Sequence, residues 1–174
     1  NLELAPVPEM LKIALDVQPE DVCLVPERRE ERTTEGGLDL IKKFHDIKNI
    51  SDELTNAGVR VSLFIAPEID QIDKAIEMQV PIIELHTGNY ADFDGELKNK
   101  ELKKIQQAVE YAKKAGLLVN AGHGLHYENV QNIAKIDGIH ELNIGHAIVA
   151  KALFIGWENA VIEMKKIIKE YAQS

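Results

Sequence analysis

The sequence is poor in cysteine, in basic residues and in long apolar runs, and each shortage excludes a class of protein. Cys23 is the only cysteine among 174 residues, so no intrachain disulfide can form and a reducing, cytoplasmic compartment is predicted. No apolar run approaches the ~18 residues of a membrane-spanning helix, so no membrane partner is expected. Lysine and arginine number 20 against 29 acidic residues, a net charge of −9, which argues against a nucleic-acid partner. Small anionic substrates stay possible, because a pocket can carry a local charge opposite to the net charge.

Short apolar runs that favour β-strands alternate with helical periodicity along the chain. The runs lie at residues 2–5, 22–25, 59–65, 81–85, 116–121 and 140–145. Most are continuously apolar, as expected for parallel strands that are covered on both faces. Between them apolar residues recur at three- and four-residue spacing, as in Leu102, Ile105 and Val109, which indicates amphipathic helices. No linker or low-complexity segment interrupts the pattern, so residues 1–174 are predicted to form a single domain.

This alternation admits two architectures, an open doubly wound sheet or part of a (β/α)8 barrel. No glycine-rich loop of the G-x-G-x-x-G type follows any of the runs, which disfavours the doubly wound nucleotide-binding sheet. A complete barrel has eight strands and usually ~250 residues, more than this chain contains. The predicted fold class is therefore an α/β TIM (β/α)8 barrel, of which this chain holds strands three to eight and their helices. We expect the first two βα units to be present in the intact protein.

Polar residues stand where four of these strands should be apolar, at the ends where active sites of such folds lie. They are Glu3, Glu84, Asn120 and Asn143. Glu3 lies within LELA and Glu84 within IIELHTG. Burial of a carboxylate costs several kcal/mol unless it is paired, and it raises the pKa, which suits a general acid or base. Strand alternation puts Ile82, Glu84 and His86 on one side. Both glutamates could instead pair with lysine or arginine inside a barrel, but their position beside loop histidines favours a catalytic role.

Two glycine–histidine turns follow the last two predicted strands and are near copies of each other. They read NAGHG at 120–124 and NIGHA at 143–147. Glycine lets the backbone approach a ligand, and a helix that starts just beyond adds the positive end of its dipole. In barrels the loops after strands seven and eight commonly bind phosphate. We therefore expect His123 to be a proton donor and His146 a phosphate ligand, the alternative being that they are ordinary turn residues. The remaining histidines, His45, His86, His126 and His140, receive no role.

Two further segments are predicted to be loops. Residues 28–37, RREERTTEGG, are placed to reach over the strand ends, where Thr33 or Thr34 could bind a substrate through its hydroxyl group; a solvated loop with a helix cap fits the spacing better. Residues 88–101 are predicted to be the longest loop, flexible and acidic. Such a loop suits a lid over an active site or a passive surface segment.

A series of segments together resembles one known family. They are NLE at 1–3, CLVPE at 23–27, TTEGG at 33–37, VSLFI at 61–65, IELHTG at 83–88, NAGHGL at 120–125 and ELNIGHAI at 141–148. In this order they are similar to the pyridoxine 5′-phosphate synthases, from the third barrel strand of that family to its C-terminal helix. The family condenses 3-amino-1-hydroxyacetone 1-phosphate with 1-deoxyxylulose 5-phosphate to give pyridoxine 5′-phosphate, inorganic phosphate and water.

The resemblance implies a role for individual residues. Glu3 would be a general base, His123 a proton donor, and Glu84 the carboxylate that stabilises charge in the transition state. Thr33 would contact substrate, and the phosphate ligands would be Gly124, Gly145 and His146. The family needs neither a metal nor an organic cofactor, and it forms homo-octamers built from dimers. Its Asn-x-Asp-His and His-x-Arg segments, which supply further ligands and a second base, have no counterpart among these residues.

The sequence leaves two alternatives open. Another phosphosugar-binding barrel enzyme, an isomerase or an aldolase, would use the same phosphate loops. A Schiff-base aldolase, however, needs a lysine at a strand end, and none of the predicted strands carries one. A non-catalytic, barrel-derived binding or assembly module is the other alternative, which the joint presence of Glu3, Glu84 and His123 disfavours.

Overall fold

The computed structural model describes residues 1–27, 33 and 36–172, and in them strands and helices alternate as predicted. The strands are β1 (Leu2–Leu4), β2 (Asp21–Leu24), β3 (Arg60–Ile65), β4 (Ile82–His86), β5 (Leu118–Gly122) and β6 (Ile139–Asn143). The helices are α1 (Pro8–Val17), α2 (Phe44–Asn56), α3 (Ile69–Met78), α4 (Gly88–Asp92), α5 (Gly95–Lys114), α6 (Val130–Ala134), α7 (His146–Ile155) and α8 (Trp157–Ala172). Each strand predicted from the sequence is confirmed to within a few residues.

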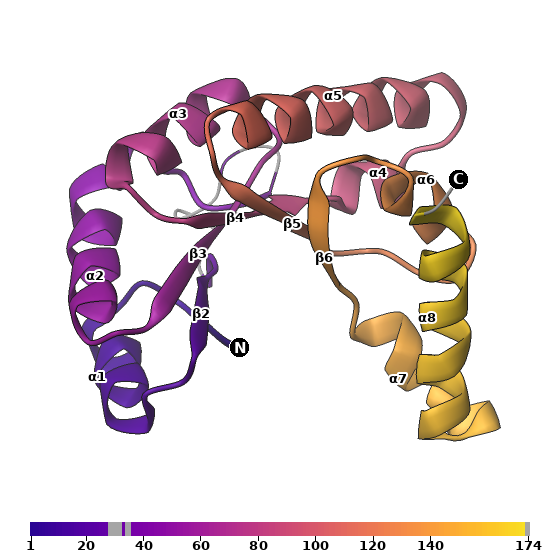
Figure 1. The fold of residues 1–174 in the computed structure, drawn as a ribbon, viewed down its shortest axis with the longest axis horizontal. Coiled ribbons are helices and arrows are strands. Elements are labelled where there is room, and N and C mark those ends of the chain that lie inside the picture. Colours follow the sequence, from indigo (N-terminus) through magenta and orange to yellow (C-terminus); the bar gives the residue numbers. More distant parts are fainter. Residues whose placement is uncertain (28–32, 34–35, 173–174) are drawn as a thin grey trace.

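The strands form one six-stranded parallel sheet in the order β1-β2-β3-β4-β5-β6. Figure 1 shows the sheet curling into an arc, with α1, α2, α3 and α5 along its outer, convex side. Sequential parallel strands joined through helices are the repeating unit of α/β barrels. Among the described residues β1 and β6 each pair on one side only, so these strands make a curled half-barrel with an open concave side.

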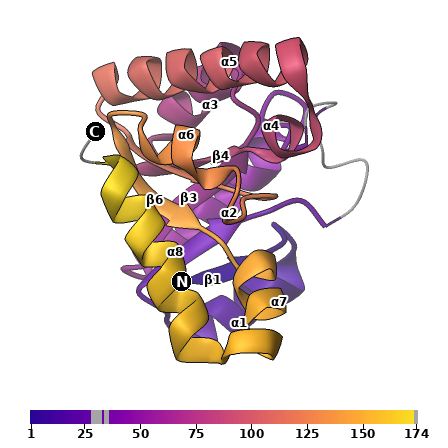
Figure 2. The same cartoon turned by 90° about the vertical axis from the view of Figure 1, so that its right-hand side faces the viewer.

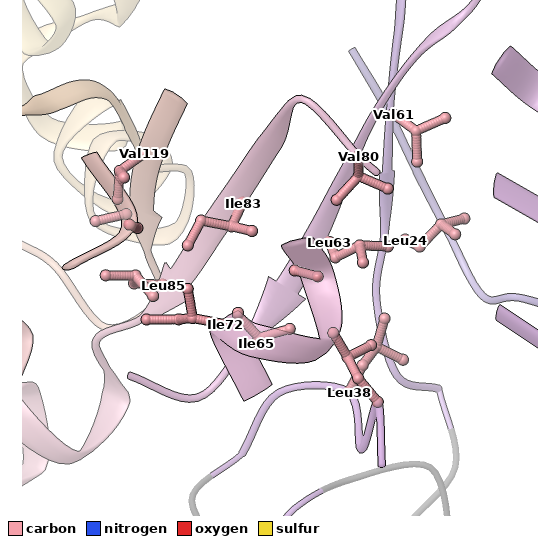
Figure 3. Packing of buried hydrophobic residues seen from close by; sticks show 14 of the residues in the cluster. Leu24, Leu38, Val61, Leu63, Ile65, Ile72, Val80, Ile83, Leu85 and Val119 are labelled. Carbon is pink, nitrogen blue, oxygen red and sulfur yellow. The ribbon is translucent and has the colours of Figure 1, made fainter. Parts of the chain in front are cut away.

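The two faces of the sheet differ in chemistry. Apolar side chains on the convex face pack under the helices, and Figure 3 labels several of them, including Leu63, Ile83 and Leu85. All three are fully buried, and each contributes roughly 1.5–3 kcal/mol by leaving water. The concave face carries Cys23 together with polar side chains such as Ser62 and Glu84, which the register places on that side. The expectation of strands with apolar cover on both faces therefore holds for the convex face only.

The C-terminal helices lie beside β6, where α8 packs against both α6 and α7. Figure 2 shows α7 and α8 next to each other on this side of the molecule. Leu153, Phe154 and Trp157 at their junction are exposed. None of the helices that the described residues form has the length and apolarity needed to cross a membrane.

The prediction of a long loop at residues 88–101 is wrong, because this segment is helical. It contains α4 and the first turns of α5. Tyr90 in α4 is buried and donates a hydrogen bond from its hydroxyl to the carbonyl oxygen of Asn129 at 2.7 Å. The glutamate, leucine and lysine residues from position 96 onward are strong helix formers, and their propensity outweighs the turn signals of the segment.

Candidate active site

A cavity of about 810 Å³ opens at the carboxyl ends of the strands, on the concave side of the sheet. Its walls come from β1, β3, β4 and β6 and from the segments that follow β2, β5 and β6. Six predicted site residues line it: Glu3, Glu84, His123, Gly124, Gly145 and His146. The fold therefore gathers into one cavity residues that are up to 143 positions apart in the chain, from Glu3 to His146.

Glu84 is the buried carboxylate of this cavity, with 4% of its surface exposed. It lies in the middle of β4, where parallel pairing on both sides fixes its backbone. Burial raises its pKa to about 7, and the nearby charge of Glu3 acts in the same direction. A carboxyl group with this pKa populates both protonation states near neutral pH, as a general acid or base requires.

Two neighbouring strands supply the hydrogen-bond partners of Glu84. The side-chain amide of Asn143, at the end of β6, donates to Oε2 at 2.7 Å. The Cys23 thiol, from β2, donates to the same oxygen at 3.6 Å. Burial, followed by the charge of Glu84, raises the pKa of Cys23 well above its usual range, so the thiol keeps its proton. These contacts from both sides fix the position of the Glu84 carboxyl group. No role for Cys23 or Asn143 was predicted from the sequence.

His123 stands in an unusual backbone conformation at the turn after β5. Its φ is +81° and that of the following Gly124 is +74°, a region that residues with a side chain rarely adopt. Thr87, which is fully buried, holds this turn. Its hydroxyl lies 2.7 Å from the carbonyl oxygen of Gly122 and 2.6 Å from that of His123, and its N–H donates to Gly122 at 2.8 Å. The turn presents the exposed imidazole to the cavity.

The second predicted phosphate turn follows the neighbouring strand, where β6 leads into α7. Gly145 is the N-cap residue of α7 and His146 is its first residue. The first turn of an α-helix has N–H groups that its own backbone does not satisfy, and its dipole favours negative charge there. Both residues are exposed and line the cavity. The arrangement suits an anion such as phosphate.

Thr33 lies outside this cavity. It lines a separate hollow of about 360 Å³ together with residues of α3 and of the segment before α2, and its hydroxyl is buried without a hydrogen-bond partner among the described residues. Its backbone forms a turn in which the Thr33 N–H donates to Gly37 at 2.9 Å. The loop reaches the main cavity through Gly36 instead. Thr34, with residues 28–32 and 35, lies outside the described residues.

Two aromatic residues of the cavity were not predicted. Phe64 from β3 and His86 from β4 lie beside His123, with ring centroids 5.3 Å apart for Phe64 and His86. Strand alternation did place His86 on the same side as Glu84, which is the signal that could have identified it. No group of three or more His, Cys, Asp or Glu side chains in the described part of the chain is arranged to hold a metal ion.

Three solved structures have a similar fold at 10–15% sequence identity. One is an HpcH/HpaI aldolase/citrate lyase family protein from Burkholderia cenocepacia, with TM-score 0.61 and 12% identity, covering 98% of this chain and 76% of that chain. Another is the BexX/CysO complex of Amycolatopsis orientalis, with TM-score 0.59, 15% identity and coverage of 94% and 62%. A third is an O-GlcNAc hydrolase variant from Thermobaculum terrenum, with TM-score 0.55, 10% identity and coverage of 76% and 36%. The chain thus spans about a third of the last protein and less than two thirds of the second, and these likenesses show the fold alone.

A family model matches almost the whole chain. It is described as pyridoxal phosphate biosynthesis protein PdxJ, and it covers residues 1–170. The match includes each strand, every predicted site residue and both glycine–histidine turns.

Proposed function

The chain belongs to the pyridoxal phosphate biosynthesis protein PdxJ family, and from this premise we propose that it is a pyridoxine 5′-phosphate synthase. The reaction condenses 3-amino-1-hydroxyacetone 1-phosphate with 1-deoxyxylulose 5-phosphate. The amine and a carbonyl group form an imine with loss of water, phosphate leaves, and an aldol-type closure with loss of a second water completes the ring. The products are pyridoxine 5′-phosphate, inorganic phosphate and water.

The observation that carries this proposal is the grouping of Glu3, Glu84 and His123 around one cavity. Each step of the condensation moves a proton, so the site needs groups that donate and accept at neutral pH. In the proposed roles Glu3 is a general base and His123 a proton donor. Glu84 is buried, has a pKa of about 7 and stabilises charge that develops in the transition state. Glu3 is exposed whereas Glu84 is buried, and such different environments allow two carboxyl groups to take different roles.

The two glycine–histidine turns support binding of phosphorylated substrates. We assign Gly124 to one phosphate-binding turn, and Gly145 with His146 to the other at the N-terminus of α7. Backbone N–H groups and a helix dipole bind phosphate without any net positive charge on the protein, which fits a chain with a net charge of −9. Thr33 is proposed as a substrate contact on the resemblance alone, because it lines a different hollow.

The remaining parts of the proposal concern the whole protein. We assign the reaction to the transferase class and give it no metal and no organic cofactor, since proton transfers suffice for each step. The proposed partners are the two small phosphorylated substrates and further copies of the chain in a homo-octamer. The proposed location is the cytoplasm.

The test is a two-substrate assay with the intact protein. Formation of pyridoxine 5′-phosphate is followed by mass spectrometry, and phosphate release is measured in the same samples. We expect equal amounts of both products only when both substrates are present. Conversion of a single substrate would indicate an isomerase or an aldolase, and binding of both without turnover would indicate a non-catalytic module; either result contradicts the proposal. When variants of the site are assayed in the same way, His45→Ala is a suitable control, because His45 is exposed on α2, away from the cavity.

A further inference from the structure

His86 is a second histidine that lies directly against His123. The two imidazole rings are stacked, with centroids 4.9 Å apart and an angle of 22° between their planes. The strands explain the contact, because His86 ends β4 opposite Gly122 of β5, one residue before His123. The Phe64 ring lies beside both imidazoles, with its centroid 5.3 Å from that of His86 and 6.4 Å from that of His123.

The His86 ring occupies a narrow slot between two glycines. A Cβ atom at Gly36 would lie 2.6 Å from Cε1 and 2.7 Å from Nε2 of this ring, and a Cβ atom at Gly88 would collide with Cε1. The Gly88 N–H also donates to Nδ1 at 3.3 Å. Contacts on several sides therefore fix the plane of the ring, and two residues without side chains make room for it.

His123 needs such support more than other residues of the cavity. It is exposed, and its φ of +81° puts it on a strained turn. Thr87 holds the backbone of this turn through its hydroxyl group. The ring contacts with His86 and Phe64 are what limit rotation of the imidazole side chain itself. A proton donor is effective only when it meets the reacting atom in one orientation.

We propose that His86 is a positioning residue for His123. Its ring, held between Gly36 and Gly88, is the wall against which the His123 imidazole lies, so that His123 meets the substrate in one orientation. This inference rests on the proposed function, because it takes His123 to be the proton donor. His86 acts through His123 and needs no proton transfer of its own.

Three variants of His86 test this. His86→Ala removes the wall, and we expect kcat to fall by about tenfold to a hundredfold, because misplaced catalytic groups lose rate on this scale. KM is expected to change by less than about threefold, since substrate binding does not use this ring. His86→Phe keeps a flat ring in the slot and should restore most of kcat. His86→Gln keeps polar atoms without a ring and should behave like alanine.

The opposite pattern overturns the proposal. Full activity of His86→Ala would show that the wall is dispensable, and rescue by Gln but not by Phe would show that His86 works through its nitrogen atoms. A main effect on KM would place His86 in substrate binding. His45→Ala is the matched control, since this exposed histidine also contacts an aromatic ring, Phe44, but lies outside the cavity.

A spectroscopic readout separates this inference from the proposed function. The Cε1–H signal of His123, assigned by comparison with a His123→Asn variant, carries the ring-current shift of its stacked neighbour. We expect this shift to be lost in His86→Ala and kept in His86→Phe, even if the wild-type protein shows no condensation activity. An unchanged signal in His86→Ala would refute the stack itself, whereas an inactive wild type with the expected shifts would refute the proposed function alone.

Discussion

Glu84 is deeply buried, and its hydrogen bonds partly offset the free-energy cost of burying a carboxylate. Removal of a carboxylate from water favours the protonated form, while the hydrogen bond from Asn143 favours the charged form. Burial has the larger effect, so the pKa is raised to about 7 from its ordinary value of 4.5. The folded state therefore binds a proton more tightly at this residue than the unfolded state does.

The pH dependence of stability follows from this difference. Between about pH 4.5 and pH 7 the folded state binds more protons at Glu84, so its contribution to the free energy of unfolding falls as the pH rises. We expect Glu84→Gln to have nearly the stability of the wild type at about pH 5, and to be more stable by about 3 kcal/mol at about pH 8. Urea denaturation of both proteins at each pH measures this. A stability difference that stays constant with pH would contradict the raised pKa.

Two glycines of the phosphate turns differ in what a side chain would meet. A Cβ atom at Gly124 would lie 2.6 Å from the Cβ of Ala91, and its φ is +74°; at Gly145 the Cβ meets nothing within 4 Å. We expect Gly124→Ala to lower the free energy of unfolding by about 1–3 kcal/mol. Gly145→Ala should leave it within about 0.5 kcal/mol and raise KM, because the added methyl group lies where phosphate would approach. Denaturation and steady-state kinetics distinguish the two. Unchanged KM in Gly145→Ala would place the phosphate elsewhere.

Most of the site is built where the carboxyl ends of the neighbouring strands β4 and β5 meet. β4 supplies Glu84 from its middle and His86 from its end, and Thr87 just beyond it holds the turn that follows β5. Thr87→Val keeps the shape of the side chain and removes its hydroxyl. We expect it to lower the free energy of unfolding by about 1–2 kcal/mol, since a buried carbonyl loses a donor, and to lower kcat because the His123 turn loosens. Thr87→Ser should keep both the free energy of unfolding and kcat of the wild type. A fully active and stable Thr87→Val would contradict the view that the Thr87 hydroxyl holds the turn.

The elements that the sequence predicted well are those with a strong local pattern. The strands are apolar runs bounded by turn signals, so all six were predicted, and the glycine–histidine turns repeat visibly. Residues 88–101 were predicted wrongly, because helix propensity and the burial of Tyr90 outweigh the local turn signals. Thr33 shows another limit: the sequence gives a loop but not the path that brings Gly36, rather than Thr33, into the cavity. The contacts of Cys23, Asn143 and His86 depend on the lateral register of strands, which no local pattern encodes.

At the scale of the whole molecule, the sheet has one apolar face and one polar face. The convex face is covered by helices, and the concave face is polar because it lines the cavity. Trp157, the only tryptophan, lies at the junction of α7 and α8. It is exposed, with 61% of its surface accessible. We expect acrylamide to quench native fluorescence almost as well as it quenches the fluorescence of the unfolded chain. A blue-shifted, protected emission would show that another chain covers this junction in solution.

The central claim is that Glu84 and His123, brought together from neighbouring strands, act on the same substrates in one cavity. A double-mutant cycle on kcat of the condensation, with Glu84→Gln, His123→Asn and the combined variant, tests it most directly. We expect each single change to lower kcat by about a hundredfold or more, and the combined variant to be only slightly slower than the slower single variant. Losses that multiply would show that the two residues act independently, and single variants with near-normal kcat would contradict the assignment of the site.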